Sequence, residues 1–203
     1  MTGRDPYQTA LRALAGFADE GRFGWGRPLI ATALADELGL SPTPVREALA
    51  RLAGEGMLEH RPGRGYFSPS PTTSDIVDLY EMHRRLAHWA LDLLHERQGS
   101  APSEGSDLTP VEAFYERLVA LAQNDVLACT HRRIVVQLRP IRRIEAEIRP
   151  AADEQVAQLE QLFGDGRLVA LRKAVDVYHH DRSEAARYVF SVMRRASKSI
   201  AGI

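Results

Sequence analysis

The chain has 203 residues, of which 44% are hydrophobic and 26% charged, so it is long enough for one or two domains with their own cores. Its 26 Lys and Arg nearly balance its 27 Asp and Glu, for a formal net charge of −1. This balance excludes a histone-like protein or a basic tail, and any nucleic-acid binding must come from a local patch.

Cysteine content and hydropathy predict the compartment. Cys129 is the one cysteine, so the sequence excludes an intramolecular disulfide and a cysteine-ligated zinc site. We expect Cys129 to be a small core residue. The sequence contains no apolar run of about 18 residues and no signal-peptide pattern, which predicts a cytoplasmic protein without a membrane partner.

Glycine and proline divide the chain into two regions. They are frequent up to a Ser/Pro/Thr cluster at 68–74 and sparse afterwards. We therefore predict one domain over 1–70 and a second over 74–203. The polar stretch 97–107 is expected to be an exposed loop of the second domain.

The first region reads as a series of short helices followed by a hairpin. Apolar spacing predicts helices over 6–19 and 30–38, and Gly39 is typical of a helix C-terminus. Ser41 is expected to cap the next helix with its side chain. After glycines end that helix, 57–68 is typical of a hairpin with two Arg and two Gly at its tip.

The third predicted helix has one buried and one exposed face. Val45, Leu49 and Leu52 form the apolar stripe, which leaves Thr43 and Arg46 exposed near its start. Helix, glycine turn, helix and hairpin together predict a winged helix-turn-helix, whose second helix enters the major groove of DNA. The alternative is a small packing or dimerisation subdomain, because helix–Gly–helix patterns are common in α-proteins.

Side-chain chemistry suits DNA contact. Ser41 and Thr43 can reach phosphates or base edges, and the Arg46 guanidinium can pair with guanine. The wing glycines allow the backbone to approach a phosphate, where Arg61 and Arg64 add charge.

The same residues resemble a known family. The stretch Leu34–Leu49, with its Ser-x-Thr-Pro-Val-Arg-Glu-Ala-Leu motif, and the wing Arg61–Phe67 resemble the DNA-binding domain of GntR-family transcriptional regulators over about residues 8–70. The resemblance implies that operator DNA is contacted by Ser41, Thr43, Arg46 and Gly63.

Two positions depart from the family pattern. Thr32, which we keep among the DNA-binding candidates, stands where the family usually has a basic residue, and Pro42 stands where Arg is common. We expect an altered operator preference or weaker affinity as a result.

The second region is predicted to be an all-α bundle that dimerises and presents two wings to a pseudo-palindromic operator. The mainly α fold class follows from both regions. The predicted helical segments are 76–95, 110–122, 125–148, 152–163, 166–178 and 182–200.

This region resembles the sensing domain of the FadR subgroup, through motifs such as Phe114-Tyr115 and Leu138-Arg139-Pro140, with 97–107 replacing a helix. Members of that subgroup commonly hold a divalent metal with one Asp and three His. The corresponding positions here are Val111, Tyr115, Leu168 and Met193. These residues are poor metal ligands, so we expect no metal and no cofactor.

A ligand site is instead expected from histidine, tyrosine and arginine. The candidates are His83, Tyr115, Arg139, Arg142 and Arg143, whose arginines could hold a carboxylate or phosphate. The alternative for the arginines is a solvated helix face paired with Glu145 and Glu147. His179-His180 is interpreted as a solvated helix end.

The leading hypothesis is a homodimeric DNA-binding regulator, a repressor, that senses a small organic acid. A second hypothesis keeps DNA binding but makes the C-terminal half a ligand-independent dimerisation module. The sequence has no phosphate-binding glycine loop, nucleophile motif or paired catalytic carboxylates, so we expect no enzyme activity.

Overall fold

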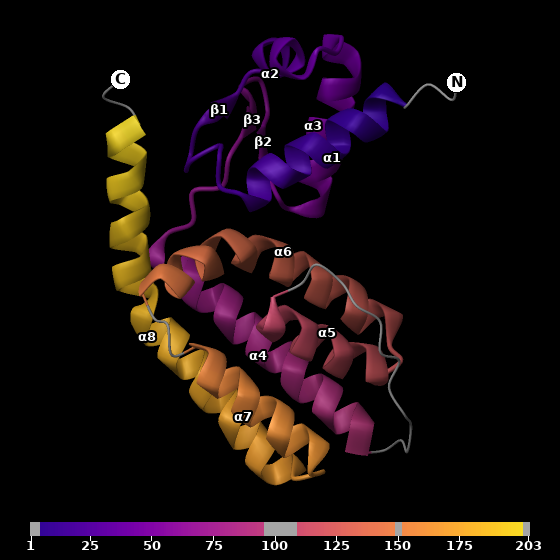
Figure 1. Cartoon of the computed structure of the whole chain (residues 1–203), viewed down its shortest axis with the longest axis vertical. Coiled ribbons are helices and arrows are strands. Elements are labelled where there is room, and N and C mark those ends of the chain that lie inside the picture. The colour runs from indigo at the N-terminus through magenta and orange to yellow at the C-terminus, as the bar shows by residue number, and fades with distance from the viewer. Residues whose placement is uncertain (1–4, 96–108, 149–151, 201–203) are drawn as a thin grey trace. The chain divides into compact units, whose positions relative to one another are not determined.

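The computed structural model describes residues 5–95, 109–148 and 152–200, and the chain forms two compact units (Figure 1). One unit is Met1–Pro71 with Phe190–Ile203, and the other is Thr72–Val189. Each has its own hydrophobic core. Within the described ranges, no helix is both long enough and apolar enough to span a bilayer.

Three helices build the core of the first unit: α1 (Pro6–Asp19), α2 (Ala31–Leu38) and α3 (Pro42–Glu55). The predicted apolar stripe of α3 is buried completely at Val45 and Leu49, and it packs with Leu14 of α1 and Ala35 of α2. Burial of one face of α3 leaves its opposite face, with Arg46, exposed. The helix-turn-helix prediction is therefore confirmed.

The turn between α2 and α3 depends on two backbone features. Gly39 ends α2 with a φ of 64°, and its N–H bonds the carbonyls of Ala35 and Asp36. Ser41 is the residue before α3, but its side chain makes no capping hydrogen bond, so that expectation is wrong. Pro44, the third residue of α3, has no N–H, which removes one of the two donors that a capping hydroxyl can accept.

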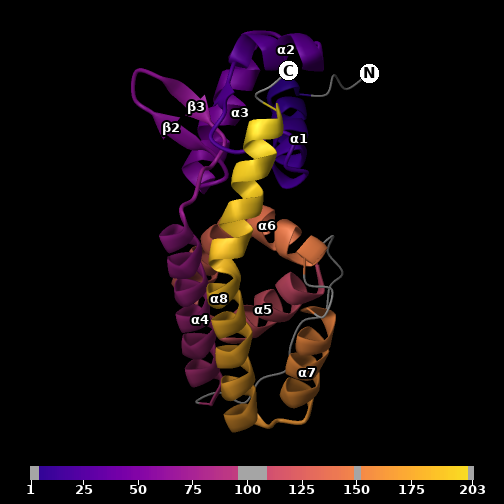
Figure 2. The same ribbon diagram turned by 90° about the vertical axis from the view of Figure 1, so that its left-hand side faces the viewer.

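A three-stranded antiparallel sheet completes this unit. Strands β2 (Glu59–Arg61) and β3 (Gly65–Phe67) form the predicted hairpin, with His60 opposite Tyr66. The short strand β1 (Pro28–Leu29) pairs with the other edge of β3, and the sequence analysis missed it. In Figure 2 the β2–β3 hairpin projects from the helices as a wing.

The second unit is all-α, as predicted. Its helices are α4 (Thr73–His95), α5 (Pro110–Leu121), α6 (Asp125–Ile148), α7 (Ala152–Gly164) and the part of α8 (Leu168–Ile200) up to Val189. Figures 1 and 2 show α7 and α8 side by side, joined by a short turn. The prediction of a break near residue 180 is wrong. The segment 168–200 contains neither Gly nor Pro, so α8 continues through His179 and His180.

Two glycines of the first unit give a matched test of this backbone. A Cβ meets nothing within 4 Å at Gly39 or Gly54, but Gly39 has a positive φ and Gly54 lies inside α3. We expect Gly39→Ala to lower the free energy of unfolding by about 1 kcal/mol because of backbone strain. Gly54→Ala should raise it by about 0.5–1 kcal/mol because alanine favours the helix.

Urea denaturation of both variants measures the two effects. Shifts of opposite sign support the left-handed turn at Gly39. A shift in the same direction for both variants contradicts it.

Candidate functional site

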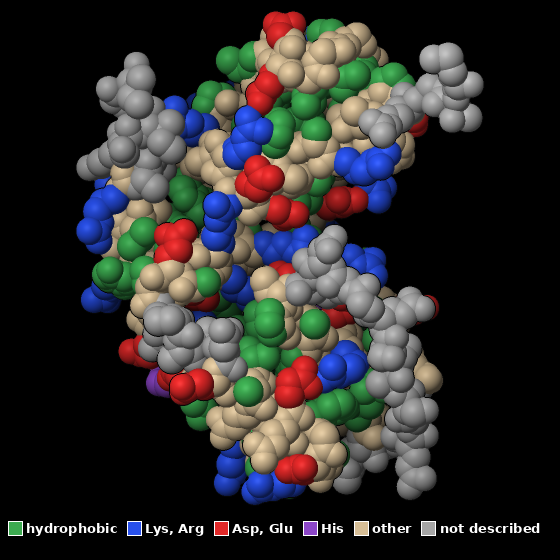
Figure 3. Space-filling view, viewed as in Figure 1, with side chains coloured by type: hydrophobic (Ala, Val, Ile, Leu, Met, Phe, Trp, Pro, Cys, Tyr) green, Lys and Arg blue, Asp and Glu red, His purple; other side chains and the backbone are tan. Residues whose placement is uncertain are grey.

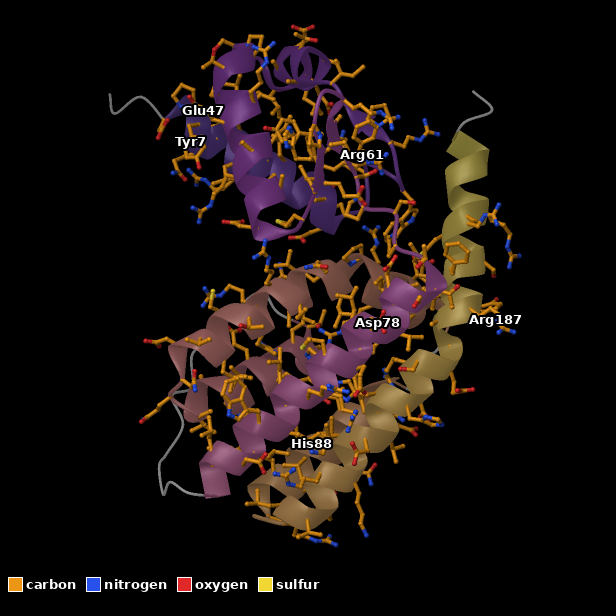
Figure 4. The ribbon with its side chains drawn as sticks, turned by 180° about the vertical axis from the view of Figure 1, so that it is seen from behind. Tyr7, Glu47, Arg61, Asp78, His88 and Arg187 are labelled. Carbon is orange, nitrogen blue, oxygen red and sulfur yellow. The ribbon has the colours of Figure 1, made fainter. Side chains whose placement is uncertain are left out.

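The first candidate surface is the amino-terminal half of α3 with the start of α2. Ser41, Thr43 and Arg46 are all exposed there, as is Thr32 of α2. Figure 4 labels Glu47, the exposed residue next to Arg46 on α3. The sequence-predicted residues of this group therefore have side chains accessible to a large partner.

Ion pairs divide the arginines of α3 and the wing into two classes. Arg51 is paired with Glu55 at 2.5 Å, and Arg61 with Glu59 at 2.7 Å. Arg46 and Arg64 make no ion pair with any residue that the structure describes. These two arginines keep their charge available for a partner.

Arg61 supports the wing from within. Its guanidinium lies 4.2 Å from the centre of the Phe67 ring, and Glu59, its ion-pair partner, also accepts the N–H of Ser70 at 3.1 Å. Arg61 is labelled on the wing in Figure 4. Because these bonds hold Arg61 against the sheet, its first role is to stabilise the hairpin.

The wing tip is exposed, and its backbone at Gly63 is open to close contact with a partner. Gly63 has a φ of 70° and nothing within 4 Å of where a Cβ would lie, and it is followed by the exposed Arg64. Figure 3 shows acidic and basic side chains interspersed over one face of the molecule. Residues 41–70 contain four arginines and three glutamates, so the basic character of the candidate surface comes from the placement of single arginines and not from a general positive field.

The second candidate site is a buried polar cluster in the helical unit. It contains His83 of α4, Tyr115 of α5, His131 and Arg142 of α6, and His179 of α8. His83, Tyr115 and His179 are at most 1% exposed and His131 is 4% exposed. Three of the predicted ligand residues, His83, Tyr115 and Arg142, thus meet in the bundle core.

A chain of hydrogen bonds connects this cluster across three helices. Arg142 Nη2 lies 3.2 Å from His83 Nε2, His83 Nδ1 lies 2.7 Å from His179 Nε2, and His179 Nδ1 lies 2.7 Å from the Val175 carbonyl. We call this chain the arginine–histidine relay.

The end of the relay fixes the protons of the two histidines. A carbonyl only accepts, so His179 donates from Nδ1, and because burial lowers its pKa to about 3 the ring is neutral and accepts at Nε2. His83 therefore donates from Nδ1 and accepts the Arg142 N–H at Nε2. Both rings are neutral and both nitrogens of each ring are bonded.

Several polar atoms of the cluster have no partner. Arg142 Nε and Nη1, the Tyr115 hydroxyl and His131 Nε2 are all buried and make no hydrogen bond within the described residues. A buried donor without a partner costs about 1–3 kcal/mol, and more when it is charged. An anion that accepts from Arg142 and Tyr115 would remove this cost.

Burial and charge keep the histidines neutral. Burial, followed by the charge of Arg142, lowers the pKa of His131 to about 4 and that of His83 well below its ordinary value. Burial is also the main cause that lowers the pKa of His179 to about 3. The interpretation of His179 as a solvated helix end is therefore wrong, because α4 and α5 cover it.

The remaining candidates lie outside the relay. Arg139 donates its Nε–H to the buried Glu112 at 3.1 Å, and Arg143 is exposed. Of the three arginines, Arg142 places nitrogens in the cluster, Arg139 bonds the buried Glu112, and Arg143 is exposed, while ligand binding by them stays a prediction. Cys129 is exposed, so its prediction as a core residue is wrong.

The cluster does not suit a metal ion. Of the positions where the FadR subgroup holds its metal, Tyr115 is the buried member of the cluster and Met193 is an apolar core residue. The imidazoles face a guanidinium instead of a carboxylate, and a second cation there would be repelled. In the described ranges no three His, Cys, Asp or Glu side chains are arranged to hold a metal. The stretch 97–107 lies outside these ranges.

The sequence analysis missed His131. On α6 it lies 11 residues before Arg142, and 11 residues at 100° per residue return to nearly the same helix face. His131 and Arg142 thus lie on the same apolar stripe of α6 as Leu138, and this placement in the sequence could have identified the pair. His131 also lines a groove of about 220 Å³ between α5 and α6, whose walls combine apolar residues such as Val119 and Val135 with the charged Glu112, Glu116, Arg132 and Arg139.

The neutral buried histidines predict a pH-dependent stability. The unfolded chain binds protons at these histidines below about pH 6.5, whereas the folded chain does not until about pH 4 or lower. The contribution of these histidines to the free energy of unfolding is therefore fully present above pH 6.5. It is lost as the pH falls from 6.5 towards 4, by up to about 1.4 kcal/mol per pH unit for each histidine.

Urea midpoints at pH 7, 6 and 5 test this expectation. His131→Gln should reduce the dependence of the urea midpoint on pH. His180→Gln is the matched control, because His180 is an exposed histidine. Equal slopes for the unmodified protein and His131→Gln would contradict a neutral, buried His131.

Comparison with known proteins agrees with this architecture. The sequence pattern described as "Bacterial regulatory proteins, gntR family" matches residues 6–67. The chain is similar to the Nta operon transcriptional regulator of Aminobacter aminovorans, with 32% identity over 149 residues, covering 65% of this chain and 71% of that protein.

Solved structures share the fold at lower identity. A GntR transcriptional regulator from Rhodococcus sp. RHA1 has a TM-score of 0.67 at 19% identity, covering 89% of this chain and 96% of its own. E. coli McbR/YncC has a TM-score of 0.56 at 19% identity, covering 94% and 98%. Membership of the FadR subgroup stays a prediction. The sequence match and the curated relative show that the chain belongs to the GntR family of DNA-binding transcriptional regulators, which are not enzymes.

Proposed function

We propose that this regulator is a homodimeric repressor that acts in the cytoplasm on a pseudo-palindromic operator. Residues 1–70 bind double-stranded DNA, and residues 74–203 dimerise and sense a small organic acid. The relative from Aminobacter aminovorans is named as the regulator of an operon, which supports control of transcription as the output.

The exposed, unpaired Arg46 on α3 carries the DNA-binding proposal. A guanidinium near the start of a recognition helix suits guanine O6 and N7, while Ser41, Thr43 and Thr32 suit phosphate or base-edge contacts. Gly63 and Arg64 at the wing tip suit a phosphate. Arg61 contributes by holding the wing in shape.

The buried cluster supports ligand sensing. Arg142 offers two buried nitrogens, and the Tyr115 hydroxyl offers a third donor beside His83. A carboxylate accepts from such donors, and the partly apolar groove beside His131 suits the body of an organic acid. The acid would then favour a dimer geometry in which the wings no longer match the half-site spacing.

Two substitutions separate the roles of the unpaired arginines. Arg46→Ala should cost about 1–3 kcal/mol of operator binding and relax discrimination at one base position. Arg64→Ala should weaken all DNA sequences alike and reduce the salt slope by about one, because it removes a phosphate contact. Arg51→Ala is the matched control, since Arg51 is already paired with Glu55.

Fluorescence anisotropy with the protein's own upstream DNA and a scrambled duplex, across a salt series, measures these effects. If Arg46→Ala binds both duplexes as the unmodified protein does, the proposed role of α3 is wrong. Sedimentation equilibrium tests the dimer, and a monomer at micromolar concentration would contradict it.

Ligand sensing is tested by thermal stabilisation. Acetate, benzoate, succinate and citrate are added to the full chain and to Arg142→Met, which removes the buried charge. An acid at about 100 times its Kd stabilises by about 2.7 kcal/mol, and it should also release operator DNA. No stabilisation by any of the four acids would favour the ligand-independent dimerisation module instead.

A further inference from the structure

We propose that the buried cluster binds an organic acid together with one proton, and that His131 is the residue that takes up this proton. The protonated ring then donates its Nε2–H to the bound carboxylate. This inference rests on the proposed sensing function and adds a binding residue and a form of regulation to it.

His131 is the cluster histidine with an available nitrogen. His83 is bonded at both nitrogens, to His179 and to Arg142, so its protonation would break the contact with Arg142. His179 is likewise bonded at both nitrogens, to His83 and to the Val175 carbonyl. His131 Nε2 is buried and makes no hydrogen bond within the described ranges. A proton at this atom therefore breaks no existing bond.

The position of His131 suits contact with a ligand. Its ring centre lies 5.1 Å from that of His83, and the residue also lines the groove between α5 and α6. His131 is therefore the cluster histidine at the wall of this groove, and Arg142 is near enough for its charge to act on the His131 ring. An acid that reaches the cluster from this groove meets His131.

The charges around His131 decide when it is protonated. Arg142 and Arg132, both of α6, oppose a positive charge on the ring, whereas Glu145 and the buried Glu112 favour the cationic Arg142. The titratable or charged groups that face the cluster come from four helices. They are Tyr80 and His83 of α4, Glu112 and Tyr115 of α5, Arg132, Arg139, Arg142 and Glu145 of α6, and Tyr178, His179 and Arg182 of α8.

A bound carboxylate reverses the balance at His131. After burial, the charge of Arg142 is the largest cause that lowers the pKa of His131 in the free protein. The carboxylate offsets this charge and accepts a hydrogen bond from the new N–H of His131. The pKa of His131 is therefore higher in the complex than in the free protein. By linkage, affinity must increase as the pH falls between these two values. The proton comes from solvent, and no bond other than N–H is formed.

Isothermal titration calorimetry of the full chain tests the proposal, with benzoate and benzenesulfonate as probes in two buffers of different ionisation enthalpy. Benzenesulfonate stays ionised throughout, so any pH dependence of its binding belongs to the protein. We expect Kd to fall about threefold to tenfold per pH unit between pH 7.5 and 5.5, with close to one proton taken up per ligand.

His131→Gln separates proton uptake from binding. Glutamine keeps a hydrogen-bonding group but cannot take up a proton, so we expect weaker binding with no proton uptake and a flat pH profile. His180→Gln, on an exposed residue, should keep the uptake. In the unmodified protein, ¹⁵N chemical shifts of the imidazoles should show His131 Nε2 becoming protonated when benzoate is added at pH 6.5, which needs no variant.

The outcomes distinguish the two proposals. Binding without proton uptake in the unmodified protein overturns the role of His131 but leaves ligand sensing intact. Uptake that persists in His131→Gln overturns the assignment of the proton to this residue. No binding of either probe, combined with no stabilisation by the four acids named above, overturns ligand sensing and this inference together.

Discussion

The helical unit depends on the direction of the arginine–histidine relay. It runs from Arg142 through His83 and His179 to the Val175 carbonyl, so it joins α6, α4 and α8 in the core. Because the carbonyl can only accept and both imidazoles are neutral, the position of each ring proton in the relay follows from that end. The relay therefore orients Arg142 with one nitrogen bonded and two buried nitrogens without partners. The bonds that join the three helices therefore also determine which Arg142 nitrogens are left for the proposed anion site.

In the DNA-binding unit, pairing between neighbours matters more than the total charge. Residues 41–70 contain four arginines and three glutamates, which gives little net charge. Glu55 and Glu59 neutralise Arg51 and Arg61, and these pairs stabilise the end of α3 and the base of the wing. The charges left outside these two pairs are those of Arg46, Arg64 and the exposed Glu47. Exposed ion pairs add little stability, but here they determine which arginines remain available to a phosphate or a base.

Local sequence signals predicted the parts of the fold that depend on local structure. The α3 stripe, the Gly39 turn and the β2–β3 hairpin all follow from residues within one element or one turn. β1 was missed because two residues gain strand character only through β3, nearly 40 positions later. His179 was misread because its neighbours in sequence are polar, whereas the groups that cover it come from α4 and α5. Exposure of Cys129 likewise depends on how α6 is turned, which a single small residue does not reveal.

Two polar connections join α4 and α8, and they differ in depth. On the half-exposed side, Asp176 accepts from Arg84 at 2.9 Å and from His88 at 2.8 Å, and Arg172 reaches back to Asp92; Figure 4 labels His88 there. Water can replace these partners when the helices shift, so this side resists movement weakly. The buried bond between His83 and His179 has no such replacement, and breaking it leaves two polar atoms unsatisfied. A ligand that engages Arg142 therefore acts on the one of these two connections that fixes α4 against α8. Under the proposed sensing function, the relay is where an acid would act on α4, the helix that follows residues 1–70 in the chain.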